Sequence, residues 1–475
     1  MSSRRTVATR PRGRIAAVLA SAAMLGGCAS FSPDRGFSVV EQTARERLGK
    51  DLQWARSPAD QDSIDLRVTE LLSKPLSVDD AVQVALLNNR GLQARFAELG
   101  ISEADLVQAG RVPNPGFSFG RSSRGDEREI ERSLHFSIAA LLAMPWTQAM
   151  QTRRFQQTQG QVAMAVLTLA ADTRKAYYTA LAAEEAVRYL RQVKQAADAS
   201  SELARRMEQV GNFNKLQRAR EQVFAADAAI NLARAEQAQR ATREHLTRLL
   251  GAWGAQTLFT LPARLPDLPT TVMDLPDVER MALAQRLDVN AAKQAAAQTA
   301  ANLGLTEATR FINVLELGLM RNGSNEAPTQ RGWEVSFELP LFDWGGARVA
   351  RAEAVYMQAL HLAAETAVNA RSEVREAYTG YRAAYDIARF QRDEVVPLHK
   401  RISEENVLRY NGMLIGVFEL LADARTQIAS VHSAIEALRD FWIAQADLDM
   451  ALIGKPSLAA AAGPAKAAAA ADPGH

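Results

Sequence analysis

Few side chains in this 475-residue sequence are of the types and spacings that do catalytic or metal chemistry. Two histidines four residues apart would be typical of a metal site, but no such pair occurs. A glycine-rich phosphate loop is also missing. The letters Gly-x-Ser-x-Gly do occur at residues 116–120, but they fall within a predicted strand and not at the strand-to-helix turn of a nucleophile elbow. We therefore expect no enzymatic activity, no metal and no cofactor. We interpret the six scattered histidines as structural or surface residues: His135, His245, His361, His399, His432 and His475.

The single cysteine, Cys28, is the clearest candidate for covalent modification. It ends the sequence Leu25-Gly26-Gly27-Cys28, which follows an apolar run (residues 15–25) too short to cross a membrane as a helix. Small residues before a cysteine match a bacterial lipobox, so Cys28 is predicted to become the lipid-modified first residue of the mature chain. The alternative is an ordinary cleavage site that lies near a cysteine. The residue after the cysteine is Ala29 and not Asp, which by the usual sorting rule predicts that the lipoprotein goes to the outer membrane. The basic residues before the run are Arg4, Arg5, Arg10, Arg12 and Arg14.

Two carboxylates, Glu419 and Asp423, stand four residues apart beside a predicted turn, so they share one face of a helix. Such a pair could attract cations in a confined passage, or it could be part of an ordinary solvated face. The formal net charge of the whole chain is only +2, which gives no support to a nucleic-acid partner.

These residues must be positioned by very long helices. Residues 161–210 contain neither glycine nor proline and are rich in good helix formers, so they predict one helix of about 75 Å. The alternative is several shorter helices. Arg174-Lys175-Ala176-Tyr177 reappears as Arg375-Glu376-Ala377-Tyr378, and Ala85-Leu86 reappears as Ala282-Leu283. The chain is therefore predicted to be a tandem duplication of about 200 residues.

Each half is predicted to hold a helix, a β-hairpin and long helices. Ser77 is a plausible N-cap for the first helix, which should run on and end before Pro113. The long helices are expected at residues 147–210, 213–250, 346–411 and 417–453, with a kink near Pro397. The predicted boundaries are a signal peptide (1–27), an extended or loosely helical arm (28–75), the first repeat (76–251), a proline-rich linker (252–276), the second repeat (277–454) and a disordered tail (455–475).

The predicted strands carry alternating apolar residues, expected to face lipid. Residues 121–132 are expected to form a charged connection in the first hairpin, and Pro340 to end the last strand. Four strands cannot close a barrel, and open edges in lipid would leave backbone groups unsatisfied, so three chains with twelve strands are predicted. A small soluble sheet is the alternative. The lipid-facing candidates are Phe117, Phe119, Leu134, Phe136, Ile138, Leu315, Leu317, Trp333, Val335 and Phe337.

These features together resemble the TolC family of outer-membrane efflux proteins, in its lipoprotein branch. The resemblance covers residues from about 76 to 454. It rests on the duplication, the order of elements and three local motifs: Ala85-Leu86-x-Asn88-Asn89, Phe337-Glu338-Leu339-Pro340-Leu341-Phe342-Asp343 and Arg409-Tyr410-Asn411-Gly412. The family implies a mainly α fold with a small β part. Three chains would form a twelve-stranded outer-membrane β-barrel above a periplasmic α-barrel of coiled helical hairpins.

The resemblance also implies a function and partners. The chain would be the passive outer-membrane exit duct of a tripartite efflux system, docked to a periplasmic adaptor and an inner-membrane pump. Glu419 and Asp423 would ring the closed periplasmic entrance. The alternative function is a periplasmic coiled-coil lipoprotein that acts as a scaffold without conducting. The candidate adaptor-contact turns, whose apolar residues could instead cap the helices, contain Gly211, Asn212, Phe213, Asn411, Gly412 and Met413.

Overall fold

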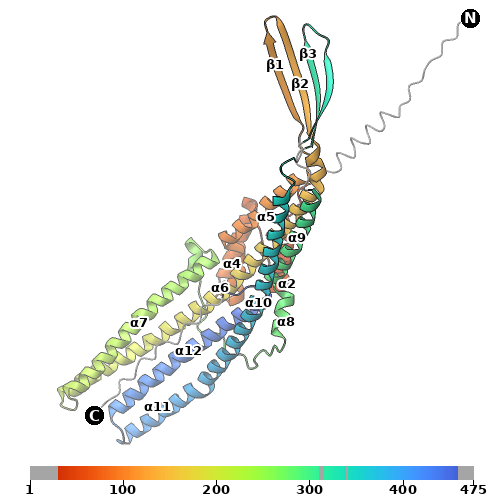
Figure 1. The fold of residues 1–475 in the computed structure, drawn as a ribbon. Helices are drawn as coiled ribbons and strands as arrows, with labels where there is room; N and C mark the ends of the chain where they lie inside the picture. The colour runs from red at the N-terminus through yellow and green to blue at the C-terminus, as the bar shows by residue number, and fades with distance from the viewer. Residues whose placement is uncertain (1–29, 310–314, 338–340, 458–475) are drawn as a thin grey trace, which may run out of the picture. The chain divides into compact units, whose positions relative to one another are not determined.

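The computed structural model describes residues 30–309, 315–337 and 341–457. These residues are mostly α-helical, with one four-stranded antiparallel sheet (Figure 1). Cys28, Leu339, Pro340 and most of the predicted tail lie outside them. The chain divides into two compact units. The first contains the sheet and comprises Met1–Val39, Ala97–Gly160 and Ala292–Ala363, and the second comprises Val40–Phe96, Gln161–Ala291 and Ala364–His475.

The two predicted hairpins are confirmed, and they join through β2 and β3 into one sheet with the order β1-β2-β3-β4. Every neighbouring pair is antiparallel, and β1 and β4 form the two edges. The strands are β1 (Gly116–Arg124), β2 (Glu127–Ser137), β3 (Leu315–Ser324) and β4 (Gln330–Phe337).

Two details of the first hairpin differ from the prediction. Residues 121–132 are not a loop: most of them pair across β1 and β2, around a two-residue turn at Gly125 (φ 62°) and Asp126. Charged residues on both faces hide the alternation there. Ile138 is not a strand residue but the first residue of a helix. The Ser137 hydroxyl accepts a hydrogen bond from the Ala140 amide (3.4 Å), which is the contact of a helix N-cap.

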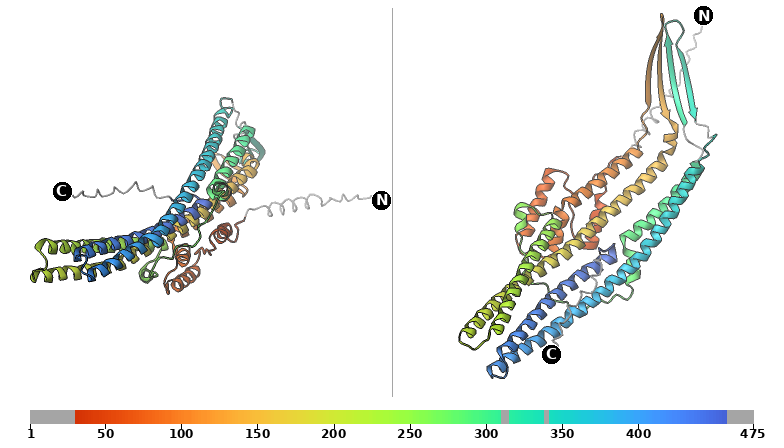
Figure 2. Two further views of the ribbon diagram at one scale, coloured as in Figure 1. Left: turned by 90° about the horizontal axis from the view of Figure 1, so that it is seen from below. Right: turned by 60° about the vertical axis from the view of Figure 1, so that its left-hand side comes forward.

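The long helices agree with the sequence pattern. Residues 161–209 belong to a single helix, and the helix predicted at 417–453 is observed with those bounds. A π-helical turn lies directly before Pro397, where a kink was predicted. Among the described residues, no helix combines the length and apolar character needed to cross a membrane. Paired long helices, α6 with α7 and α11 with α12, are visible from two further directions in Figure 2.

The helices are α2 (Phe37–Leu48), α3 (Pro58–Leu72), α4 (Val78–Asn88), α5 (Arg90–Ala109), α6 (Ile138–Gln209), α7 (Lys215–Leu250), the 3-10 helix η1 (Gly254–Leu258), α8 (Val278–Gln285), α9 (Leu287–Thr309), α10 (Gly346–Phe390), the π-helical turn η2 (Gln391–Val395), α11 (Val396–Asn411) and α12 (Val417–Ile453).

Two expectations, one about residues 28–75 and one about the first helix of the repeat, differ from the structure. The segment predicted as an extended or loosely helical arm contains α2 and α3, and α3 buries Ile64, Val68 and Leu71 in the main core of the second unit. Its apolar residues recur at helical spacing, and burial of that stripe fixes the helix. The first helix of the repeat does begin after the N-cap Ser77, but it breaks at Asn89, whose backbone is extended.

Tyr177 and Tyr378 occupy equivalent positions in the two repeats, and each forms a hydrogen bond with the backbone. In the first repeat, the Tyr177 hydroxyl donates to the Leu76 carbonyl oxygen (2.8 Å), two residues before α4 begins. In the second repeat, the Tyr378 hydroxyl accepts from the Leu275 amide (3.3 Å), three residues before α8 begins. Both tyrosines therefore hold the segment that leads into the first short helix of their repeat. Burial raises the pKa of Tyr177, so its hydroxyl stays protonated as a donor.

The break between α4 and α5 in the first repeat, and the break between α8 and α9 in the second, both contact the end of a long helix. Asn88 and Asn89 donate through their amide groups to the Gly251 (2.9 Å) and Leu249 (2.9 Å) carbonyl oxygens at the end of α7. Gly251 has a φ of 64°, and a Cβ there would lie 2.6 Å from the Asn88 carbonyl oxygen, so glycine is required. At the position equivalent to Asn89, Arg286 contacts the Ala451 carbonyl oxygen (3.5 Å) near the end of α12.

Arg286 is a buried charge, with a side chain only 1% exposed. Its guanidinium binds Asp288 (2.7 Å) and Glu373 (2.6 Å), which joins the start of α9 to α10. Desolvation opposes the charge, but the hydrogen bonds to these carboxylates outweigh it and raise the pKa of Arg286. The buried charge of Arg286 is therefore neutralised by Asp288 and Glu373. Removing any one of the three side chains would leave a buried charge without its partner.

We predict that Arg286→Met lowers the free energy of unfolding by about 3 kcal/mol, the lower end for breaking a buried pair, because Asp288 and Glu373 keep some contact with water. Denaturant unfolding followed by helical circular dichroism would measure it. Arg280→Met is the matched control, since Arg280 also pairs with a carboxylate, Asp277, but is 81% exposed, and it should cost less than about 1 kcal/mol. Equal losses in both variants would contradict a special role for the buried triad.

Candidate functional site: a two-faced sheet and the helix turns

One face of the sheet is apolar. Residues paired directly across antiparallel strands share a face, and so do residues two apart along a strand. Phe117, Leu134, Leu319 and Trp333 form one row across all four strands. Two further rows on this face contain Phe136, Leu317 and Val335, and then Leu315 and Phe337. All the residues predicted to face lipid, except Ile138, therefore lie on one face. The side chains there are largely exposed, for example 72% of Trp333 and 67% of Phe117.

The opposite face is small, polar and acidic. Its carboxylates do not lie opposite one another: Glu131 pairs with Gly120 and Asn322, and Glu334 pairs with Gly318. Glu316 likewise lies opposite Ser137 and Ser336. Like charges directly across a ladder are destabilising, and an uncharged or basic residue opposite each carboxylate avoids this. An apolar face that excludes water and an acidic face that attracts cations and water thus belong to one thin sheet.

The turns between the long helices were predicted as contact points, and their residues differ in exposure. Gly211, Asn212, Asn411, Gly412 and Met413 are all exposed. In the first turn Gly211 takes a positive φ (81°), as expected for glycine.

Two turn residues, Phe213 and Met413, differ from the other residues of these turns. Phe213 is buried (8% exposed), directly before the N-cap Asn214, so it packs at the start of α7 and does not offer a free contact. In the second turn the positive φ falls on Met413 (59°) and not on Gly412 (−81°). Met413 is 93% exposed, so an apolar side chain is held outward on a conformation that disfavours it.

The predicted acidic pair lies in the first turns of α12. Glu419 is exposed, and Asp423 is half-buried. The Asp423 Oδ2 atom is shielded from solvent and has no hydrogen-bond partner among the described residues. A shielded carboxylate oxygen without a donor favours a cation or a donor from outside this chain. The role of the pair at an entrance stays a prediction.

A polar link near these turns was not predicted from the sequence. Glu221 of α7 is 1% exposed and accepts hydrogen bonds from Arg425 of α12 (2.9 Å) and from the Ser200 hydroxyl of α6 (2.8 Å). The Arg425 guanidinium also lies 4.3 Å from the ring centre of Phe224. The link joins α6, α7 and α12. A single glutamate within a long polar helix gives no sequence signal for it, because its partner is about 200 residues away.

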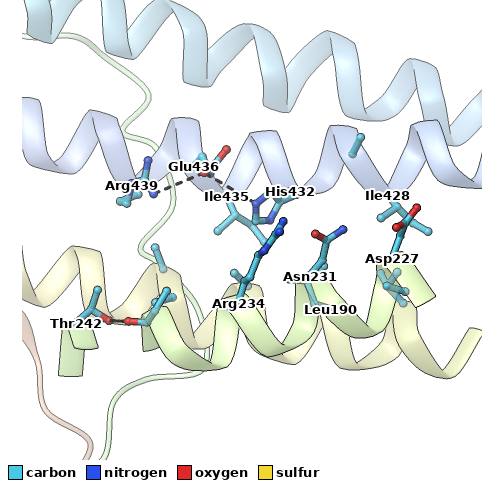
Figure 3. Close-up of a pocket in the computed structure, with 18 of the residues that line it drawn as sticks. Leu190, Asp227, Asn231, Arg234, Thr242, Ile428, His432, Ile435, Glu436 and Arg439 are labelled. Carbon is cyan, nitrogen blue, oxygen red and sulfur yellow. Dashed lines mark hydrogen bonds and ion pairs between the residues drawn. The ribbon is translucent and has the colours of Figure 1, made fainter. Parts of the chain in front are cut away.

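A groove of about 700 Å³ continues from this link between α7 and α12. Figure 3 shows His432, Ile435 and Glu436 of α12 across the groove from Asn231 and Arg234 of α7. Glu436 is paired within its own helix, at 3.8 Å from Arg439 and 3.9 Å from His432. Along the groove Glu436 is thus paired within α12, whereas Glu221 and Arg425 form an ion pair between α7 and α12. Within the described part of the chain, no three histidine, cysteine or acidic residues gather into a metal site.

We predict that Glu221 and Arg425 are energetically coupled. A double-mutant cycle with Glu221→Gln and Arg425→Gln, measured by denaturant unfolding, should give a coupling of about 1 kcal/mol or more, reduced from that of a fully buried pair because Arg425 is 36% exposed. The control cycle uses Lys194 and Asp198, an exposed i,i+4 pair on α6, and should give about 0.3–0.5 kcal/mol. A coupling energy no larger than that of the control would show that Glu221 and Arg425 interact no more strongly than an exposed surface pair.

Solved structures of outer-membrane channels have the same fold. No protein-family model and no curated protein matches the sequence. The chain is similar to CusC (16% identity, 80% of this chain and 92% of that one, TM-score 0.66). It is similar to the Campylobacter jejuni channel CmeC (16%, 82% and 86%, 0.64) and to the open state of the Neisseria gonorrhoeae channel MtrE (18%, 79% and 89%, 0.66). With its long helices and its small four-stranded sheet, the chain has the fold of the TolC-like outer-membrane efflux channels.

Proposed function

We propose that this protein is an outer-membrane channel that acts as the passive exit duct of a tripartite efflux system. The observation that carries the proposal is the two-faced sheet with unpaired edges. Its apolar face suits lipid, its acidic face suits a water-filled lumen, and its strands of 8–11 residues approach the 9–11 residues of a strand that crosses a bilayer. The shared fold with solved outer-membrane channels supports the same reading.

The open edges set the number of chains. In lipid, each unpaired backbone group on β1 and β4 costs several kcal/mol, so the edges must pair. Pairing β1 of one copy with β4 of the next closes a barrel, and three copies give twelve strands, within the range of known outer-membrane barrels. We therefore propose a homotrimer. A lipid on Cys28 would anchor each chain in the outer membrane, and loss of fatty-acid labelling in Cys28→Ser would test that anchor.

The partners follow from the fold and the exposed turns. We propose that Met413 and its neighbours Asn411 and Gly412, together with Gly211 and Asn212, meet a periplasmic adaptor that connects the channel to an inner-membrane pump. An apolar side chain exposed on a tight turn is a suitable anchor for a protein contact. Phe213 is excluded from this surface because it is buried. The channel itself would supply no energy and no catalysis.

We predict that the detergent-purified protein is a trimer that conducts in planar bilayers, and that the two faces of β4 respond oppositely to charge. Val335→Arg places a cation on the apolar face, at a cost of up to about 2–4 kcal/mol per chain in lipid, so few trimers should insert. Ser336→Arg, one residue away on the acidic face, is the matched control; it should insert and conduct with a weaker preference for cations. Mass measurement by light scattering and single-channel recording would report both.

Several outcomes would overturn the proposed channel. A stable monomer that conducts would contradict the shared barrel. A soluble protein that never inserts, with Val335→Arg as harmless as Ser336→Arg, would instead favour a periplasmic scaffold without conduction.

We also propose that Glu419 and Asp423 form the acidic constriction at the periplasmic entrance. Three copies would gather six carboxylates, which attract cations and can bind divalent metal ions. Glu419→Gln with Asp423→Asn should lower cation selectivity and weaken block by divalent ions. Single-channel recording at low salt, where screening is weak, would measure both effects. The control removes two exposed carboxylates from α3, with Asp62→Asn and Glu70→Gln. Unchanged selectivity and metal block in the first variant would place the constriction elsewhere.

A further inference from the structure

Three arginines form a continuous row across the apolar face of the sheet. Arg132 of β2 pairs with Arg321 of β3, and Arg321 pairs with Arg331 of β4. The row lies two residues beyond the row of Leu134, Leu319 and Trp333, towards the hairpin turns, and therefore about 7 Å from it. All three arginines are exposed. Their Cβ atoms are cross-strand neighbours, at a typical separation of about 5 Å.

Nothing within the described part of the chain compensates this positive charge. None of Arg132, Arg321 and Arg331 forms an ion pair there, and every acidic residue of the four strands lies on the opposite face. Arg121 and Arg128 add to the positive charge further along the same face. The opposite face keeps its like charges apart with glycine and serine, whereas this face places them side by side. A row of like charges that destabilises the sheet alone is stabilised by an anion from outside.

The position of the row identifies the kind of anion. Arginine forks bind phosphate through paired hydrogen bonds. Because the row is continuous with the apolar rows, a ligand that spans both must have a phosphate joined to hydrocarbon. Exposed aromatic residues follow the other ends of the strands: Trp146 (47% exposed) after β2, and Phe342 (99%) and Trp344 (62%) after β4. The apolar band thus has aromatic residues beyond one end and arginines at the other, as an asymmetric membrane would require.

We propose that Arg132, Arg321 and Arg331 bind the phosphate groups of an anionic lipid in the leaflet that surrounds the hairpin ends, with the acyl chains of that lipid along the apolar rows. This inference rests on the proposed barrel, since only a membrane-inserted sheet presents the row at the depth of lipid headgroups. The site fixes the depth of the barrel, because moving the sheet inward or outward would separate the guanidinium groups from the phosphates.

The experiment compares lipid retention by the full-length trimer. Protein is reconstituted into phosphatidylcholine vesicles that contain a minor fraction of diphosphoryl lipid A, or the same fraction of its dephosphorylated form, and then extracted for native mass spectrometry. The wild-type trimer should retain the phosphorylated lipid and not the other. Replacing all three arginines by Gln should reduce retention roughly tenfold, the effect of losing about 1.4 kcal/mol of binding. Replacement by Lys, which keeps the charge and loses the fork, should give an intermediate loss.

The control variant removes three arginines elsewhere, Arg67→Gln, Arg124→Gln and Arg280→Gln. Arg124 lies on the acidic face of the same hairpin, and Arg67 and Arg280 lie on exposed helix surfaces. This variant should retain the lipid as the wild type does. Equal loss in both variants, or equal retention of the two lipid forms, would overturn the site. Complete displacement by millimolar inorganic phosphate would show a free-anion site and would overturn the lipid assignment.

Conductance measured on the same preparations distinguishes failure of this site from failure of the proposed function. Trimers that conduct normally but retain no phosphorylated lipid would overturn the lipid site and leave the channel intact. Protein that neither assembles nor conducts would overturn the channel, and the lipid site with it. Conduction by the Gln variant with weaker lipid retention and slower insertion is the result expected here.

Discussion

The unpaired edges of the sheet are the constraint on which the rest of this structure depends. Strands β1 and β4 form the outer edges of the sheet, and among the described residues no further strand pairs with either edge. In water such edges invite aggregation, and in lipid they cannot be left open at all. In the trimer proposed above, identical neighbours would supply the missing partners. The division of side chains between an apolar and an acidic face would then decide which side of the proposed barrel meets lipid.

The duplication is held together by contacts that recur at equivalent positions but use different chemistry. Tyr177 donates its hydroxyl hydrogen to the backbone, whereas Tyr378 accepts from the backbone. Asn89 binds the end of α7 with a neutral amide, and Arg286 binds near the end of α12 with a charge that two carboxylates must neutralise. The geometry has thus been retained while the residues diverged. Each repeat solves the same local problem, which is to fix the break between two consecutive helices against the end of a long one.

Sequence reasoning predicted the elements whose signals are local. The start of α4 at Ser77, the unbroken α6 and the bounds of α12 follow from caps, glycine and proline, and helical periodicity. The errors fell where tertiary contacts decide. The sequence left open whether Phe213 contacts a partner or caps a helix, and its burial favours the cap. The arm is helical because α3 is covered by the core. The link from Glu221 to Arg425 could not be predicted, because neither residue differs from an ordinary helix charge until the fold brings them together.

The buried charge of Arg286 and the link from Glu221 to Arg425 differ in how readily each can open. Arg286 is 1% exposed and is held by two carboxylates that are themselves mostly covered, so water cannot replace its partners without unfolding the surroundings. In the link to α12 only Glu221 is buried, while Arg425 is 36% exposed and borders a groove. Water can therefore solvate Arg425 as it leaves, which lowers the cost of separation. The burial of both sides of the Arg286 triad, against the burial of one side of the Glu221 link, is therefore sufficient to make the second contact the easier one to separate.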